Sequence, residues 1–465
     1  MSAASAVTAT VHPVRTGSGQ RKKVALAAVL LGMVISAFEG TVVTTAMPTI
    51  TGALHGRELF AWVFTAFLLA SMIGVLLAGK FGDHFGRRPT FLGGMALFLG
   101  GSALCGVAPS MPWLITFRAV QGLGAGALQP TTMTITADLF TLEQRAHVQS
   151  LITGVWGLAN VLGPVIGGWI VSHASWRWVF LVNLPVGIVS AALLVYSYRD
   201  GERPHQKLEI AGPVLAGVAA ALVLFALEPH APRSLRLLSA ALGAVTGGLF
   251  VLTQKRTQQP VVPFEYLGDR TVQTGLLGGA VGGALLYATA TYVPLWISGR
   301  GHGPLAAGFA LVPMLAAWAV GSTFGVKILI RGGMRYSCGA GFLVAALGAI
   351  ALACCAAFDA SMVWTLLSLA LLGVGIGPAI STSVLGPQSV VPHHTRSIVT
   401  SAVYSTRMVG GAVAIALLDL LGRTASHALV WIAPLAIVGG VAVMALSPAT
   451  PPGEEIDVRE LSAAE

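Results

Sequence analysis

Fourteen apolar segments, each long enough to cross a bilayer, follow one another with only short loops between them, and this pattern restricts the fold more than any other feature. Of the 465 residues, 55% are hydrophobic and only 10% are charged, whereas soluble domains carry roughly 25% charged residues. One helical span needs about 20 apolar residues. The sequence therefore predicts an all-α integral membrane protein and not a β-barrel, whose strands are short and alternate in polarity. The expected spans are 24–49, 59–79, 89–107, 112–137, 147–172, 177–197, 211–227, 235–253, 272–297, 305–327, 337–357, 362–387, 398–420 and 428–447.

Positive charge is distributed unevenly between the loops, and this predicts the orientation of the chain. The N-terminus, the even-numbered loops and the C-terminal tail hold 19 of the 27 lysine and arginine residues, whereas the odd-numbered loops hold 6. Because cytoplasmic loops carry the excess of positive charge, both termini are expected in the cytoplasm. The scatter of these residues between apolar segments argues against nucleic-acid binding, despite the net charge of +9. Low lysine relative to arginine, with high alanine and glycine, is typical of a GC-rich bacterium, so we expect its inner membrane.

An internal repeat divides the chain. The glycine-rich run 122–126 recurs as 373–377, an offset of 251 residues that Arg145 and Arg396 share. Two parallel six-span repeats are typical of transporters that bind substrate near the bilayer midplane, between the halves. The expected parts are a cytoplasmic tail (1–23), an N-terminal six-helix bundle (24–200), two inserted helices with their linkers (201–271), a C-terminal six-helix bundle (272–447) and a second cytoplasmic tail (448–465).

Glu39 is the one carboxylate found deep inside an expected span. A charge at the bilayer centre costs on the order of 3 kcal/mol, so such residues usually face a cavity and work there. Glu39 is therefore the predicted proton-carrying group. Arg407, in the thirteenth span, is the charge of opposite sign that the helix geometry places at a similar depth. We expect a Glu39–Arg407 salt bridge, which protonation of Glu39 would break.

A loop rich in glycine and arginine follows the second span and resembles the cytoplasmic loop motif of the major facilitator superfamily, G-x-L-A-D-R-x-G-R-R/K. Glycines permit a tight turn, and Asp83 is suited to cap a helix or to pair with an arginine. This predicts a latch between the halves; the alternative is that the arginines only set orientation. The residues that match the motif are Gly79, Asp83, Gly86, Arg87 and Arg88. The sequence differs from the motif at Phe81, Gly82 and His84.

Two further motifs lie in spans 4 and 5. Arg118 begins a run that resembles the proton-antiporter motif R-x-x-Q-G-x-G-A of the same superfamily. Such an arginine would hydrogen-bond inside the bundle and stabilise the ionised form of a nearby acid; the alternative is that it extends to the outer headgroups. Gly163, Pro164, Gly167 and Gly168 resemble the antiporter motif of drug exporters. Small residues permit close helix packing and proline removes a backbone bond, so a bendable hinge is expected.

The first and thirteenth spans carry the resemblance further. Phe38 to Pro48 resembles L-D-x-T-I-V-N-V-A-L-P of the fourteen-span drug:proton antiporters, with Glu39 in place of aspartate and Thr44 in place of asparagine. Arg407 opens a segment resembling that family's R-x-x-G-G. The resemblance covers roughly residues 25–450. It implies the major facilitator fold, with two six-helix bundles plus two inserted helices, fourteen transmembrane helices and both termini cytoplasmic.

These features predict a proton-coupled exporter, an antiporter of amphipathic small molecules or drugs that works by alternating access. Glu39, Arg407 and Arg118 are the expected coupling residues. The expected drive is the proton gradient, without a cofactor or metal, because no nucleotide-binding P-loop is found. The partners are then the substrate, protons and the lipid bilayer, and the sequence identifies no accessory protein. The candidate cavity residues are Met33, Thr41, Thr44 and Trp156.

Other functions are weaker alternatives. The cargo could be a lipid, a fatty acid or an endogenous metabolite, since an arginine would attract an anionic headgroup. A membrane-embedded enzyme would need a second acid or a nucleophile–base pair within the spans, and we find neither. An ion channel has no need of latch and hinge motifs.

Overall fold

The computed structural model describes residues 19–448, apart from 141, 201–208, 229–230, 258–259, 262–263, 393–395 and 423. The side chains of some helical residues, Asp83 and Trp156 among them, also lie outside the described part. Within these limits the chain is helical and contains no β-strand. In chain order the elements are α1 (Gly19–Leu54), η1 (Arg57–Leu59), α2 (Phe60–Phe85), α3 (Arg87–Gly106), α4 (Met111–Leu139), α5 (Leu142–His173), α6 (Trp178–Leu181), α7 (Asn183–Ser197), α8 (Ala211–Ala226), α9 (Arg233–Arg256), η2 (Phe264–Tyr266), α10 (Arg270–Gly299), α11 (Pro304–Met334), η3 (Arg335–Gly339), α12 (Ala340–Ala357), α13 (Met362–Val390), α14 (Arg396–Leu421) and α15 (Ala425–Leu446).

The helices lie where the spans are expected. The all-helical fold is confirmed, and eleven segments of the described chain are long and apolar enough to cross a membrane. Helices α4, α5 and α8 are not among these eleven. The count of fourteen spans and the cytoplasmic position of both termini therefore remain predictions.

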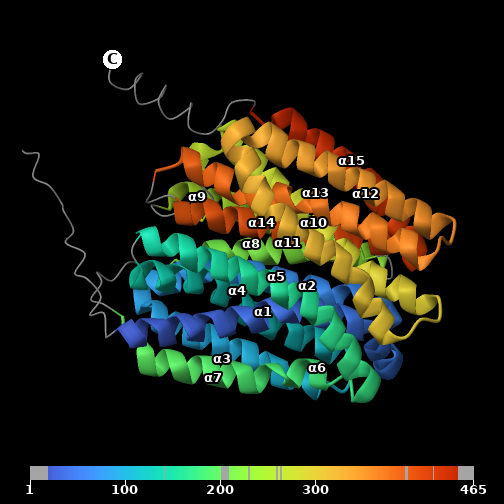
Figure 1. Ribbon diagram of the computed structural model, residues 1–465, viewed down its shortest axis with the longest axis horizontal. Helices are drawn as coiled ribbons and strands as arrows, with labels where there is room; N and C mark the ends of the chain where they lie inside the picture. Colours follow the sequence, from blue (N-terminus) through green and yellow to red (C-terminus); the bar gives the residue numbers. More distant parts are fainter. Residues whose placement is uncertain are drawn as a thin grey trace, which may run out of the picture.

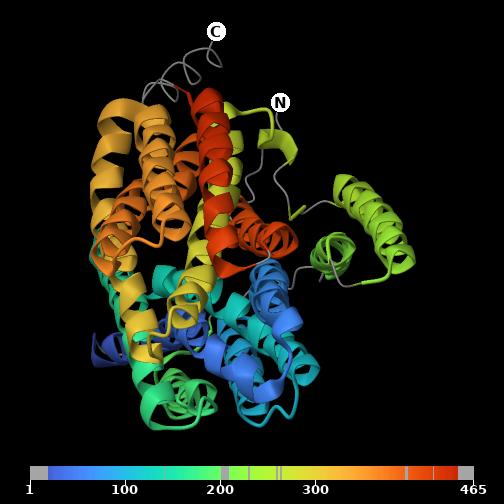
Figure 2. The ribbon, with the colours of Figure 1, turned by 90° about the vertical axis from the view of Figure 1, so that its right-hand side faces the viewer.

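The helices form two groups. Helices α1 to α7 make one group and α10 to α15 the other, and Figure 2 shows them one above the other in blue to green and in yellow to red. The same two layers are seen in Figure 1. Helices α8 and α9 lie at the side of the molecule, where α8 packs against α2: the ring of Phe225 lies 6.0 Å from that of Trp62.

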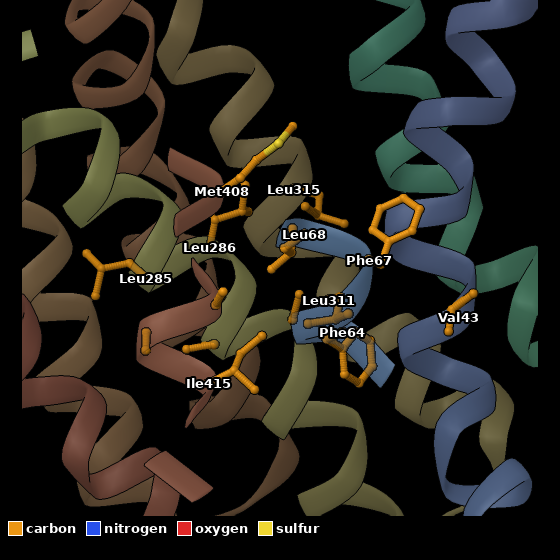
Figure 3. Packing of buried hydrophobic residues seen from close by; sticks show 14 of the residues in the cluster. Val43, Phe64, Phe67, Leu68, Leu285, Leu286, Leu311, Leu315, Met408 and Ile415 are labelled. Carbon is orange, nitrogen blue, oxygen red and sulfur yellow. The ribbon is translucent and has the colours of Figure 1, made fainter. Parts of the chain in front are cut away.

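An apolar core crosses the boundary between the groups. Phe64 and Phe67 of α2 belong to the same buried cluster as Leu311 and Leu315 of α11 and Met408 of α14, and Figure 3 shows Phe64 next to Leu311. All five side chains are buried or nearly so. In a bilayer such contacts stabilise the protein through van der Waals packing rather than through removal of surface from water.

The glycine run of α4 brings that helix into backbone contact with α2. A Cβ atom at Gly122 or Gly126 would overlap the carbonyl oxygen of Phe67 or Ser71, respectively. Since these oxygens belong to backbone, a side chain at either glycine would force the two helices apart. The close approach fixes α4 relative to α2 and so determines where the side chains on either side of the run are placed.

The second glycine run packs in the same way. Gly373 and Gly377 of α13 lie against the carbonyl oxygens of Met314 and Trp318 on α11. In both groups the two contacts are four residues apart, which is about one helical turn. The α2–α4 and α11–α13 pairs are thus equivalent contacts, as an internal repeat requires.

We predict that Gly126→Ala destabilises the protein, whereas Gly100→Ala on α3 does not. The new methyl group at position 126 would meet the backbone of Ser71, an overpacking that costs about 1–3 kcal/mol, while nothing lies within 4 Å of a Cβ atom at Gly100. Thermal unfolding of the purified variants in detergent measures the difference. Equal melting temperatures for the two variants would contradict the packing described for α2 and α4.

Candidate functional site

Glu39 and Arg118 form an ion pair inside the first group of helices. The side chain of Glu39 on α1 is 0% exposed and that of Arg118 on α4 is 1% exposed, and Nη1 of Arg118 donates to Oε1 of Glu39. Removing a single charge from water costs several kcal/mol, which a close partner of opposite sign offsets. The pairing explains how the chain keeps a carboxylate within a membrane-length helix.

The pair belongs to a closed ring of hydrogen bonds, the Glu39 network, made of Glu39, Arg118, Gln121, Ser102 and Asn183. Asn183 Nδ2 donates to Glu39 Oε2 at 2.6 Å, and Arg118 Nη1 also donates to Gln121 Oε1 at 2.7 Å. Gln121 Nε2 donates to Ser102 Oγ at 2.7 Å, and Asn183 Nδ2 approaches the same oxygen at 3.4 Å. Four helices, α1, α3, α4 and α7, therefore meet at one buried carboxylate.

Phe67 of α2 covers one side of the network. The Arg118 guanidinium carbon lies 4.0 Å from the centre of the Phe67 ring and 6.0 Å from that of Phe180. At 4.0 Å a cation over an aromatic face is attracted by the ring quadrupole. Phe67 also lines the cavity described next, so its ring stands between that cavity and the ion pair.

A central cavity of about 60 Å³ lies between the two groups of helices. Its lining comes from α1, α2 and α4 on one side and from α10, α11 and α14 on the other, so any movement of one group against the other changes its shape. The lining residues are Ser36, Ala37, Gly40, Thr41, Phe67, Ser71, Ala125, Gly126, Gln129, Leu286, Tyr287, Ala290, Leu315, Trp318, Arg407 and Met408.

The expected Glu39–Arg407 salt bridge is wrong for this structure. Glu39 is bonded to Arg118 and Asn183, whereas Arg407 lies in the central cavity with its guanidinium carbon 4.3 Å from the centre of the Tyr404 ring. The expectation compared depths along the helices, and two residues at one depth need not face each other. The sequence also left open that Arg118 extends to the outer headgroups, whereas its side chain lies inside the bundle, bonded to Glu39.

Of the candidate cavity residues, Thr41 lines the central cavity. Thr44 is buried and donates to the carbonyl oxygen of Thr41 at 2.6 Å. Met33 packs with Val148 and Ile152, in the contact between α1 and α5. Trp156 lies outside the described side chains.

The loop motif after α2 is held by an acid that the sequence analysis missed. Gly86 has φ +99°, a conformation that favours glycine, and a Cβ atom there would meet the Asp200 carboxylate. Asp200 accepts from the backbone N–H groups of Arg87 and Arg88 at 2.8 and 3.1 Å, so it caps the start of α3. Asp83, the cap expected from the motif, lies outside the described side chains.

The arginines of this loop bond to neighbouring helices. Arg87 forms an ion pair with Asp138 of α4 and donates to the carbonyl oxygen of Thr134 at 2.7 Å. Arg88 donates to the carbonyl oxygen of Val195 on α7 at 2.9 Å. These contacts join helices within the first group, and a latch across the groups stays a prediction. Nothing lies within 4 Å of a Cβ atom placed at Gly79.

The hinge motif of α5 contacts both groups of helices. Gly163 lies against the Thr41 hydroxyl of α1, and Gly167 lies against Val42 and Thr45 of the same helix. On the other side, Gly168 packs on the backbone of Pro304 and Leu305 in α11. A Cβ atom at Gly308 of α11 would overlap the carbonyl oxygen of Pro164. The motif therefore forms a close seam between α5 and α11.

Sequence reasoning missed two further members of the Glu39 network. Asn183 and Ser102 stand in apolar spans without a motif around them. The available signal was the polarity of Asn183, because an uncharged amide in a membrane span also needs partners. Gln121 is the glutamine of the R-x-x-Q motif that begins at Arg118, but the motif alone did not predict a role for it.

Comparison with known proteins places the chain in a family. The model of the Major Facilitator Superfamily matches residues 29–415. The multidrug transporter protein MdtP of Bacillus subtilis is 32% identical over 411 residues, covering 87% of this chain and 76% of that protein. Multidrug resistance protein 3 of the same organism is 32% identical over 372 residues, covering 77% and 72% of the two chains. The solved structure of an auto-inhibited POT family peptide transporter superposes with a TM-score of 0.68 at 15% identity, covering 91% of this chain and 96% of the other. The chain belongs to the major facilitator superfamily.

Proposed function

We propose that the protein is a proton-coupled exporter of amphipathic small molecules, with Glu39 as the group that takes up and releases the proton. The observation that carries this proposal is the fully buried Glu39–Arg118 pair, separated by one aromatic ring from a cavity that both halves line. The similarity to relatives named as multidrug transporters supports a small-molecule cargo. The alternative cargo, a lipid, fatty acid or endogenous metabolite, would use the same coupling group.

Protonation of Glu39 changes the energy of the whole network. A neutral carboxyl no longer balances the Arg118 guanidinium, and breaking a buried pair by removing one partner costs about 3–5 kcal/mol. The arginine then gains by moving toward other partners. Gln121, the carbonyl oxygen of Val63 at 3.5 Å and the Phe67 ring already lie beside it. Because Phe67 lines the cavity, a shift of Arg118 alters the substrate site directly.

The amide of Asn183 is suited to both protonation states. Its Nδ2 donates to the ionised carboxylate, and its Oδ1 is buried with no hydrogen-bond partner in the described part of the chain. Rotation of the amide would present that oxygen as an acceptor for the hydroxyl of protonated Glu39. Asn183 is thus a positioning residue for the proton site.

Alternating access would use the seam between α5 and α11. In the orientation expected from the loop charges, Gly168 and Pro304 lie toward the outer face, so this seam would be the contact that closes the outer side. Opening it requires the glycine-to-backbone contacts of α5 and α11 to separate. The proposed location is the bacterial inner membrane, with fourteen spans and both termini in the cytoplasm.

One prediction of this proposal concerns Glu39→Gln. Glutamine keeps the shape of the side chain but cannot carry a proton, so proton-driven transport of lipophilic ions is expected to fall to the level of protein-free vesicles. The measurement is uptake of fluorescent lipophilic cations and acids into proteoliposomes under an imposed pH gradient. Glu58→Gln, at an exposed acid in η1, is the matched control and should transport as the wild type does. Undiminished gradient-driven uptake by Glu39→Gln would contradict the proposal.

Another prediction of this proposal concerns Asn183→Leu. Loss of a hydrogen bond to a charged group is expected to lower the free energy of unfolding by about 1.5–3 kcal/mol and to shift the pH dependence of transport. The control is Ser190→Ala on the same helix, which removes a buried hydroxyl bonded to the carbonyl oxygen of Ala28 at 2.7 Å. That change should cost about 1 kcal/mol and leave the pH profile unmoved. Identical pH profiles for both variants would remove Asn183 from the proton site.

A further inference from the structure

The central cavity carries positive charge. Among the described residues that line it, Arg407 is the one charged side chain, and the others are apolar, hydroxyl, amide or aromatic. Glu39 stands beside two lining residues in the sequence, Gly40 and Thr41, yet its carboxylate is bonded to Arg118 and Asn183. Within the described chain no acid lines the cavity or forms an ion pair with Arg407.

Arg407 lacks the partner that a buried guanidinium requires. The side chain is 8% exposed, and within the described residues it makes neither an ion pair nor a hydrogen bond. Its guanidinium carbon lies 4.3 Å from the centre of the Tyr404 ring, and the neutral phenol of Tyr287 is a further neighbour. A buried charge of this kind is costly unless it is paired. An unpartnered guanidinium in a cavity is therefore a site for an anion, whose oxygens accept strong charge-assisted hydrogen bonds.

A second unsatisfied donor lines the same cavity. The indole N–H of Trp318 on α11 is buried and has no partner in the part of the chain described here. An indole nitrogen donates and cannot accept. The Arg407 guanidinium and the Trp318 indole N–H are therefore two donors that lack an acceptor. Neither donor can accept a hydrogen bond from an ammonium group.

The two donors stand on tightly packed helices. A Cβ atom at Gly283 of α10 would overlap the backbone carbonyl of Arg407, and Gly377 of α13 lies against the carbonyl of Trp318. Donors fixed by backbone packing lose little freedom when a ligand binds, which favours affinity. The large apolar side chains of the lining include Phe67, Leu286, Leu315 and Met408, which come from four helices (Figure 3).

We propose that the exported molecule is an amphipathic organic anion. Its carboxylate or comparable acidic group binds Arg407 and Trp318, and its apolar body lies against Phe67, Leu286, Leu315 and Met408. This inference rests on the proposed transport function and assigns its substrate class. It also gives Arg407 a role separate from the proton-carrying Glu39.

The test is equilibrium binding of two probes that share one ring system, 9-anthracenecarboxylate and 9-anthracenylmethylammonium. Each is titrated at neutral pH into the full-length protein in detergent, with fluorescence anisotropy as the readout. The wild type is expected to bind the carboxylate at least about tenfold more tightly, and Arg407→Gln to lose at least about tenfold of that affinity. Arg331→Gln, at an exposed arginine of α11, is the matched control and should bind as the wild type does.

Several outcomes would overturn the proposal: tighter or equal binding of the ammonium probe, no binding of the carboxylate, or unchanged affinity in Arg407→Gln. If that variant does not fold, Trp318→Phe replaces it and should weaken carboxylate binding about twofold to tenfold. Displacement of the probe by dodecanoate or by phosphatidylglycerol, in separate titrations, distinguishes a free carboxylate from a lipid phosphate. Displacement by either supports an anion site.

This binding assay needs no pH gradient, so it separates the two proposals. Carboxylate binding without gradient-driven transport would retain the substrate class and reject proton coupling. Gradient-driven transport with tighter binding of the ammonium probe would retain proton coupling and reject the anionic substrate class.

Discussion

The pairing of Glu39 with Arg118 is the interaction on which the rest of the N-terminal half depends. A carboxylate without exposure to solvent is tolerable in a membrane span when a cation and further donors surround it. Here the guanidinium supplies the charge, Asn183 supplies a second donor, and Gln121 and Ser102 complete the ring. The ionised form of Glu39 is therefore stabilised only while four helices keep their relative positions. Protonation of Glu39 would remove the charge that these donors stabilise.

Close helix packing is what brings these groups together. The glycines of α4 allow backbone contact with α2, which places Phe67 over Arg118 on one side and into the central cavity on the other. The equivalent glycines of α13 fix α11, where Trp318 lines the opposite wall. The two halves of the repeat thus have similar helix packing but different charged groups. The N-terminal half holds the Glu39–Arg118 ion pair away from the cavity, and the C-terminal half places Arg407, which has no ion-pair partner in the described chain, in the cavity.

Much of this could be predicted from the sequence, because span length, loop charge and glycine spacing are local properties. The helices lie at the expected positions, and Glu39 and Arg118 were both identified as candidates. The pairing could not be derived in the same way. Depth along a helix does not fix the direction in which a side chain points, so Arg407 was chosen over Arg118 as the partner of Glu39. Asn183 and Asp200 act through tertiary contacts more than a hundred residues from the groups they bind, and no local pattern marks them.

The central claim is that Glu39 changes its protonation state in the folded protein. Infrared difference spectroscopy of the protein in lipid, as the pH is lowered, tests it most directly. A protonated-carboxyl band should appear in the wild type, shift when the protein is labelled with ¹³C-glutamate, and be absent from Glu39→Gln. A wild-type spectrum that lacks this band at every pH at which the protein remains folded would mean that Glu39 holds the structure together without carrying a proton.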